Sequence, residues 1–209
     1  MIRKLVLTFA IIPLLSGCAT LSALGGASAP FDAYQIRASE DPGSARSRQN
    51  IDVIVELPSA GAAFDTESIL IRPQATQVQY LPDARWIETV PEMVQTALVD
   101  GLDRTGAFRF VGRRPLGSSG DYALVTNITA FNAEVEPDGI TARIDIRITA
   151  RMVREADLAI VASDVFSATA VVPDTSTESL IAGFNEAGSD ALDRMVGWVL
   201  SSRGVRLGT

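Results

Sequence analysis

The stretch ITARIDIRITARM, residues 140–152, alternates between apolar and polar side chains without a break. Successive side chains of a β-strand point to opposite faces of a sheet, so this period of two predicts a strand. The apolar set is Ile140, Ala142, Ile144, Ile146, Ile148, Ala150 and Met152, and the polar set is Thr141, Arg143, Asp145, Arg147, Thr149 and Arg151. We therefore expect a sheet that packs one face on a core and turns the other toward water or a partner.

Two further long strands flank this one, at about residues 121–135 and 158–172. The first pair is separated by Glu136-Pro137-Asp138-Gly139, which is typical of a tight turn. Proline presets its backbone angle, aspartate bonds to nearby backbone N–H groups, and glycine accepts a positive φ. The three long strands are therefore predicted to form an antiparallel meander.

Two helices are predicted around this meander. The first begins at the capping box Thr89-Val90-Pro91-Glu92 and ends before Gly106, and the second covers residues 176–202. The apolar stripe of the second helix is Leu180, Phe184, Ala187, Ala191, Met195 and Trp198. Shorter strands are expected at residues 31–37, 51–57, 68–72, 76–81 and 108–111.

These elements predict the fold class. A helix between two strands favours one right-handed crossover with a parallel strand pair. The expected fold is α/β (α+β): a single domain with a mixed, mostly antiparallel sheet and two main helices packed against it.

The N-terminus is typical of a bacterial lipoprotein. A basic start at residues 1–4 is followed by the apolar run Leu5–Leu15, which is too short to span a bilayer comfortably. The end of this run, Leu15-Ser16-Gly17-Cys18, looks like a lipobox, in which the cysteine receives lipid and the signal is cut before it. We expect a signal peptide at residues 1–17, lipid attachment at Cys18 with a flexible tether at 18–30, and a domain at 31–209. Ala19, where an aspartate would favour the inner membrane, favours the outer membrane.

The composition excludes several classes of function. The chain has no histidine, a single lysine (Lys4) and a single cysteine, which removes histidine-based triads, Schiff-base lysines and ordinary zinc sites. Its net charge is −7 and it has no basic block, which argues against nucleic acid as a partner. We therefore predict no enzyme, no metal and no cofactor, with a carboxylate-pair hydrolase as the remaining enzymatic alternative.

The region from Tyr80 to Val111 resembles the ABC-type transport auxiliary lipoprotein family, which includes the lipoprotein of the paraquat-inducible system. The motifs that carry the resemblance are Tyr80-Leu81-Pro82, Ala84-Arg85-Trp86, Val90-Pro91-Glu92-Met93-Val94-Gln95 and Gly106-Ala107-Phe108. The resemblance implies a periplasm-facing lipoprotein that works beside an ABC permease, an ATPase and an Mce-domain protein. Such systems move phospholipids or other hydrophobic molecules between the two membranes. The family offers no catalytic residues to transfer to this chain.

Two surfaces are candidates for binding. Tyr80, Leu81, Arg85 and Trp86 form either a docking patch for the Mce-domain protein or for a neighbouring copy in a homo-oligomer, or a segment folded under the first helix. The arginine row 143, 147 and 151 either binds anionic headgroups or acidic partners, or is a solvated sheet face with acidic neighbours. A second functional class stays open: an envelope structural or activator lipoprotein, of the secretion-pore or cell-wall synthase type, with similar topology.

Overall fold

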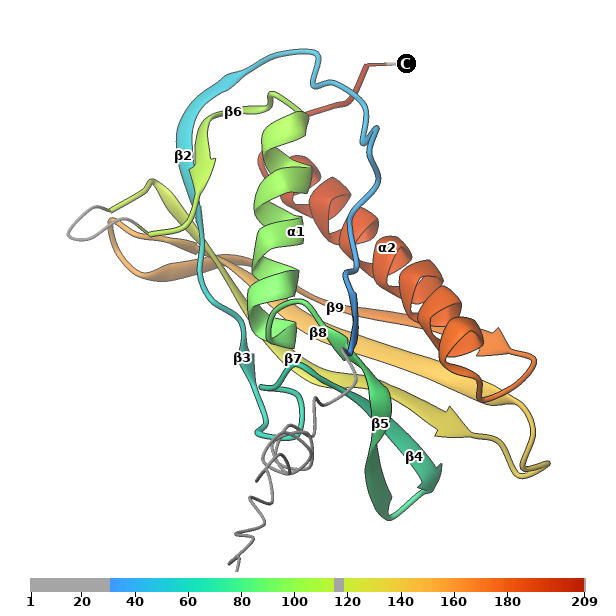
Figure 1. The fold of residues 1–209 in the computed structure, drawn as a ribbon. Coiled ribbons are helices and arrows are strands. Elements are labelled where there is room, and N and C mark those ends of the chain that lie inside the picture. The colour runs from blue at the N-terminus through green and yellow to red at the C-terminus, as the bar shows by residue number, and fades with distance from the viewer. Residues whose placement is uncertain (1–30, 115–118, 209) are drawn as a thin grey trace, which may run out of the picture. The chain divides into compact units, whose positions relative to one another are not determined.

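The computed structural model describes residues 31–114 and 119–208, which form a mixed sheet with two helices (Figure 1). The strands are β1 (Asp32–Tyr34), β2 (Gln49–Val55), β3 (Ser59–Ala60), β4 (Ser68–Gln74), β5 (Gln77–Trp86), β6 (Phe108–Gly112), β7 (Tyr122–Val135), β8 (Ala142–Arg154) and β9 (Ala159–Val172). The helices are α1 (Val90–Arg104) and α2 (Thr177–Ser202). The predicted fold class is confirmed.

The long strand β7 organises the sheet. On one side it pairs antiparallel with β8 along its whole length, and β8 pairs in the same way with β9. On its other side β7 meets three short parallel neighbours in turn: β2 near Leu124, β3 near Asn127 and β4 near Ala133. The long antiparallel ladders therefore dominate a sheet whose parallel pairings are short.

The strand after α1 belongs to a parallel pair, as predicted, but its partner is not the strand that directly precedes the helix. β6 follows α1 and pairs parallel with β2, whereas β5 pairs antiparallel with β4 and parallel with β1. The connection from β2 to β6 therefore includes β3, β4 and β5 as well as α1.

Both helices begin at a side-chain cap, and the cap of α1 is the predicted one. Thr89 accepts a hydrogen bond from the Glu92 backbone N–H, and the Glu92 carboxylate accepts one from the Thr89 N–H, which completes the capping box. Ser176 caps α2 through the Ser179 N–H. The two helices lie on the same side of the sheet (Figure 1). We call the opposite side the outer face.

The core lies between the sheet and the helices. From Ala142 to Met152, the predicted apolar set of β8 is at most 2% exposed. Trp86, Phe131 and Phe184 meet at its centre, with ring centroids 5.2–5.9 Å apart. An aromatic cluster therefore ties β5, β7 and α2 together.

Two side chains differ from the sequence-based expectation. Ile140 belongs to the turn rather than to β8, and it is 63% exposed. Trp198 is only partly buried on α2, where its ring packs edge-on against Phe166 at 5.7 Å. The turn itself is as predicted: Gly139 has φ +70°, and Asp138 accepts from the Ile140 and Thr141 N–H groups.

Candidate functional site

The predicted lipid attachment residue, Cys18, and the tether at 18–30 lie outside the described residues. Lipidation therefore stays a prediction from the sequence. Neither described helix is long and apolar enough to cross a bilayer.

The predicted docking residues Tyr80, Leu81, Arg85 and Trp86 all lie in β5. Tyr80 is 45% exposed, Leu81 is partly buried, and exposed Arg85 lies 3.6 Å from the Glu67 carboxylate. Trp86 is 1% exposed and belongs to the aromatic core cluster. The Trp86 ring is inaccessible to a partner, which for this residue agrees with the alternative expectation of a segment folded inward.

The physical reason is a bulge around Pro82. The pairing between β4 and β5 shifts register between Leu70 and Ser68, and proline is tolerated there because it has no N–H to donate. After the shift, Ala84 and Trp86 turn inward and Arg85 turns outward. The bulge therefore divides these residues between the surface and the core.

The predicted arginine row lies on the outer face, and its members have different environments. Arg143 donates to Glu134 and Glu136, at 3.0 Å each, and to Asp145 at 2.6 Å. The hydrogen bond to Glu136 and the nearby charges raise the pKa of Arg143. At Arg143 the row is therefore a solvated sheet face with acidic neighbours.

Arg147 and Arg151 are different. Both are exposed, and neither has a carboxylate partner within residues 31–114 and 119–208. Arg147 donates through Nε to the Ser167 hydroxyl at 3.2 Å. These two guanidinium groups are consequently available to an external anion or carboxylate.

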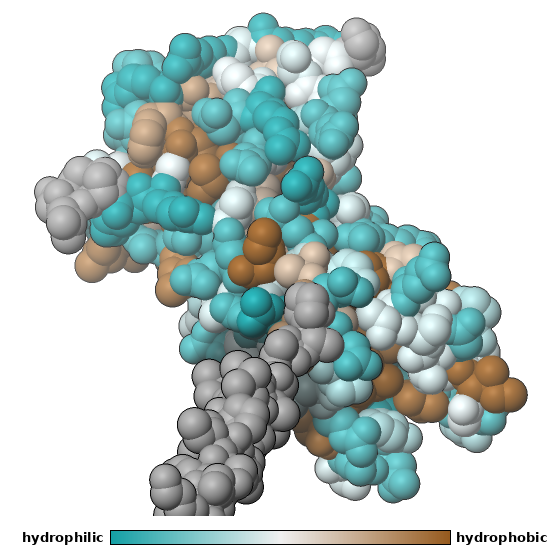
Figure 2. Space-filling model, viewed as in Figure 1, coloured by the Kyte–Doolittle hydropathy of each residue, from teal (hydrophilic) through white to brown (hydrophobic). Residues whose placement is uncertain are grey.

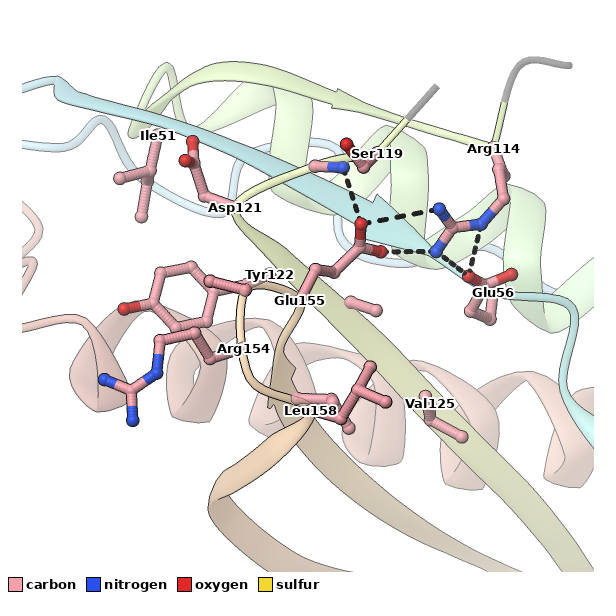
Figure 3. Close-up of a pocket in the computed structure, with 14 residues that line it drawn as sticks. Ile51, Glu56, Arg114, Ser119, Asp121, Tyr122, Val125, Arg154, Glu155 and Leu158 are labelled. Atoms are coloured by element: carbon pink, nitrogen blue, oxygen red, sulfur yellow. Dashed lines mark hydrogen bonds and ion pairs between the residues drawn. The ribbon is translucent and has the colours of Figure 1, made fainter. Parts of the chain in front are cut away.

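A groove of about 710 Å³ opens where β7 begins and the β8–β9 hairpin turns (Figure 3). Its apolar lining includes Val125, Val153 and Leu158, and its polar lining includes Glu56, Arg114 and Glu155. A volume of this size is in the range of ligand pockets and could receive several side chains. The separate sequence motifs did not indicate this groove, because it is assembled from four distant segments.

The polar wall of the groove is an ion network. Arg114 donates to both Glu56 and Glu155, and Glu155 also accepts the Gly120 N–H at 2.8 Å (Figure 3). The hydrogen bond from Arg114 lowers the pKa of Glu155 despite the burial of its carboxyl, and the same bonds raise the pKa of Arg114. Glu155 is therefore held ionised. An ionised carboxylate can link neighbouring strands through ion pairs, but it has no proton to donate as a general acid.

Leu158 stands at the rim of this groove in an unusual conformation. It ends the β8–β9 turn with φ +58°, and its side chain is 77% exposed. A left-handed conformation costs a residue with a Cβ about 1–2 kcal/mol, and glycine or asparagine is usual at such positions. The described chain offers little packing to offset this cost.

The described residues contain no group of three or more potential ligands that could hold a metal ion. The carboxylates that line the groove, Glu56, Asp121 and Glu155, are each paired with an arginine. The arrangement is suited to binding a partner through shape and charge.

Comparisons with known proteins agree with this description. The chain is 25% identical over 180 residues to an uncharacterized protein of Bradyrhizobium diazoefficiens; the match covers 84% of this chain and 47% of that protein, so the chain spans about half its length. A crystal structure of a protein from Xanthomonas campestris has a TM-score of 0.73 at 22% identity, and the match covers 84% of this chain and 97% of that one. Another, of an uncharacterized protein, has a TM-score of 0.59 at 14% identity, with coverages of 82% and 99%.

These two structural likenesses establish the fold. The model of the ABC-type transport auxiliary lipoprotein component matches residues 34–196, which include α1, most of α2 and all strands except the start of β1. The chain therefore belongs to the ABC-type transport auxiliary lipoprotein family.

Proposed function

We propose that this protein is a lipid-anchored, periplasm-facing accessory of an ABC-type system that moves lipids or other hydrophobic molecules between the two membranes. Its partners in this proposal are an Mce-domain protein, an ABC permease and an ATPase. The family match over residues 34–196 carries the proposal, and the lipobox-like Leu15-Ser16-Gly17-Cys18 supports the anchor. Ala19 favours the outer membrane as the site of anchoring.

The protein is proposed to have no catalytic turnover of its own. The chain lacks the histidine that most hydrolytic nucleophiles need, and the Glu155 carboxyl is held ionised by Arg114. A role in binding and positioning fits the exposed arginines and the open groove better than a role in chemistry.

The anchor and the partners can be tested together. Radiolabelled palmitate should enter the wild-type chain and not the Cys18→Ser variant. The tagged wild type, purified from its native envelope in mild detergent, should bring down the permease, the ATPase and the Mce-domain protein. Recovery of a secretion pore or a cell-wall synthase instead would favour the alternative class of envelope activator and contradict the proposal.

A further inference from the structure

The outer face of the sheet exposes an unusual set of apolar side chains at one end. Val125 is 37% exposed, Val165 is 54%, Ile160 is 59% and Leu158 is 77%. A solvated face of an antiparallel sheet normally carries polar residues at such positions. On the opposite, helix-covered side, Figure 2 shows mainly hydrophilic and neutral side chains over the helices. Contiguous exposed apolar side chains mark interaction sites.

The strand register places Arg147 and Arg151, which have no carboxylate partner among the described residues, beside these apolar side chains. Arg151 lies between Val125 of β7 and Ser163 of β9, and Arg147 lies between Ala130 and Ser167. The row between the two arginines holds Asn127, Thr149 and Val165. Adjacent strands are about 4.8 Å apart, so apolar side chains and guanidinium groups form one surface. We define the outer-face patch as Val125, Arg147, Arg151, Leu158, Ile160 and Val165.

We propose that the outer-face patch is the docking surface for an amphipathic segment of the Mce-domain protein, one that carries apolar side chains and at least two carboxylates. The inference rests on the proposed function for the identity of the partner. The carboxylates would pair with Arg147 and Arg151, and the apolar side chains would cover the valines and Ile160. Arginine is enriched among the residues that contribute most to binding at protein interfaces.

The groove lies beside this surface and could receive a side chain of the partner. Val125 and Leu158 belong both to the patch and to the groove lining, so the two are continuous (Figure 3). An apolar side chain of the partner that enters the groove would contact Val125, Val153 and Leu158. Such a contact would give a role to Leu158, which is strained and exposed. Nothing in its environment in the isolated chain gives it one.

Charge and shape together favour this occupant over two others. An anionic lipid surface could pair with Arg147 and Arg151, but it offers no side chain to the groove that is continuous with the patch. A second copy docked face to face would bring the arginines of one copy against those of the other. An acidic, partly apolar segment of another protein can pair with the two arginines and also place an apolar side chain in the groove.

The test is a titration of the full lipidated chain, in nanodiscs of neutral lipid, with the periplasmic part of the Mce-domain protein. Arg147→Glu with Arg151→Glu should weaken Kd at least tenfold. The matched control, Arg37→Glu with Arg206→Glu, makes the same change in net charge away from the patch and should bind as wild type. If both double variants bind equally well, the outer-face patch is not the docking surface, and the proposed function is unaffected.

A second variant separates docking from folding. Leu158→Asn suits the left-handed conformation, so the melting temperature should stay the same or rise while Kd weakens at least tenfold. Leu57→Asn, at an exposed leucine beside Glu92 of α1, is the matched control and should leave Kd unchanged. Unaltered binding by Leu158→Asn would overturn the role of the groove rim.

The remaining outcomes assign the face to other occupants. The patch variants could lose binding to phosphatidylglycerol vesicles and still bind the Mce-domain protein. They could likewise lose self-association in sedimentation velocity and still bind it. Either result would overturn the proposal. Loss of Mce binding with Tyr80→Asp alone would place the contact on β5 instead. If wild type binds no Mce-domain protein and brings down no permease or ATPase, the proposed function falls together with this inference.

Discussion

Phe184 occupies the centre of the aromatic cluster that joins α2 to the sheet. It is fully buried, and its ring lies 5.2 Å from Trp86 and 5.6 Å from Phe131. Truncation to alanine leaves a cavity that rigid neighbours cannot fill, so Phe184→Ala should lower the free energy of unfolding by about 3–5 kcal/mol. Chemical denaturation of wild type and variant measures this loss. Trp198→Ala should cost less because Trp198 is only partly buried, and equal losses would contradict the difference in burial.

Glu155 should make stability depend on pH. Its folded-state pKa is lowered mainly by the hydrogen bond from Arg114, so the unfolded chain binds a proton more readily. The contribution is thus present above the ordinary pKa of glutamate, near 4.5, and is lost as pH falls through the lowered value. We expect Glu155→Gln to destabilise the protein at pH 7 by about 1 kcal/mol, since Arg114 is partly exposed.

The same variant should lose little at low pH. Unfolding of wild type and Glu155→Gln by urea at pH 7 and again below pH 4 measures the difference. The gap between the two proteins should close as the wild-type carboxyl is protonated. A gap that is constant with pH would show that the substitution acts through packing rather than through the charge of Glu155.

Helix α2 shows how one element can be predicted correctly while its contacts are not. Its position and cap follow from Ser176 and the apolar stripe, but the periodic pattern gives no reason for glycines inside a helix. A Cβ on Gly183 would lie 2.5 Å from Val172 Cγ1 and 2.8 Å from Ile144 Cγ1, and one on Gly188 would lie 2.5 Å from Ile36 Cγ2. These glycines allow the helix to approach the sheet and the segment after β1 closely.

The glycines of α2 provide an internal comparison. Gly183→Ala should lower the free energy of unfolding by about 1–3 kcal/mol, because the added methyl group overpacks against Val172 and Ile144. Gly197→Ala meets nothing within 4 Å and should instead raise it by up to about 1 kcal/mol through better helix propensity. Thermal melts of the two variants compare these effects. Stabilisation by both substitutions would show that the packing around Gly183 yields easily.

The strands divide into those that alternation predicts and those that it does not. β8 follows its period of two from Ala142 to Met152, since one face is buried under the helices. β5 departs from a simple period because the bulge near Pro82 changes which side chains turn inward. The partners of β7 depend on contacts between distant segments, which a local pattern does not contain. This is why the core could be predicted from the sequence, whereas the groove at the end of the sheet could not.

The whole molecule has two different sides. The side with α1 and α2 closes the core, and the outer face leaves Arg147, Arg151 and Leu158 exposed. If Cys18 carries lipid as proposed, the twelve residues 19–30 link the membrane to the domain. A linker of that length has a root-mean-square span of about 20 Å and a limit of about 40 Å. The anchored domain would thus remain beside its membrane, and its partner would have to reach it.

Anchoring should therefore matter for function even if it does not change the docking surface. A periplasmic form that carries a cleavable secretory signal and lacks Cys18 should bind the Mce-domain protein in solution with the wild-type Kd. At native expression it should nevertheless fail to restore envelope integrity to a strain that lacks the protein, measured as resistance to detergent. The reason is concentration: a tether of this length holds the domain at a local concentration on the order of millimolar, which a free protein at native abundance does not reach. Overexpression of the soluble form should restore part of the function by mass action. Full restoration at native abundance would show that the tether is dispensable and that the domain acts as a free carrier.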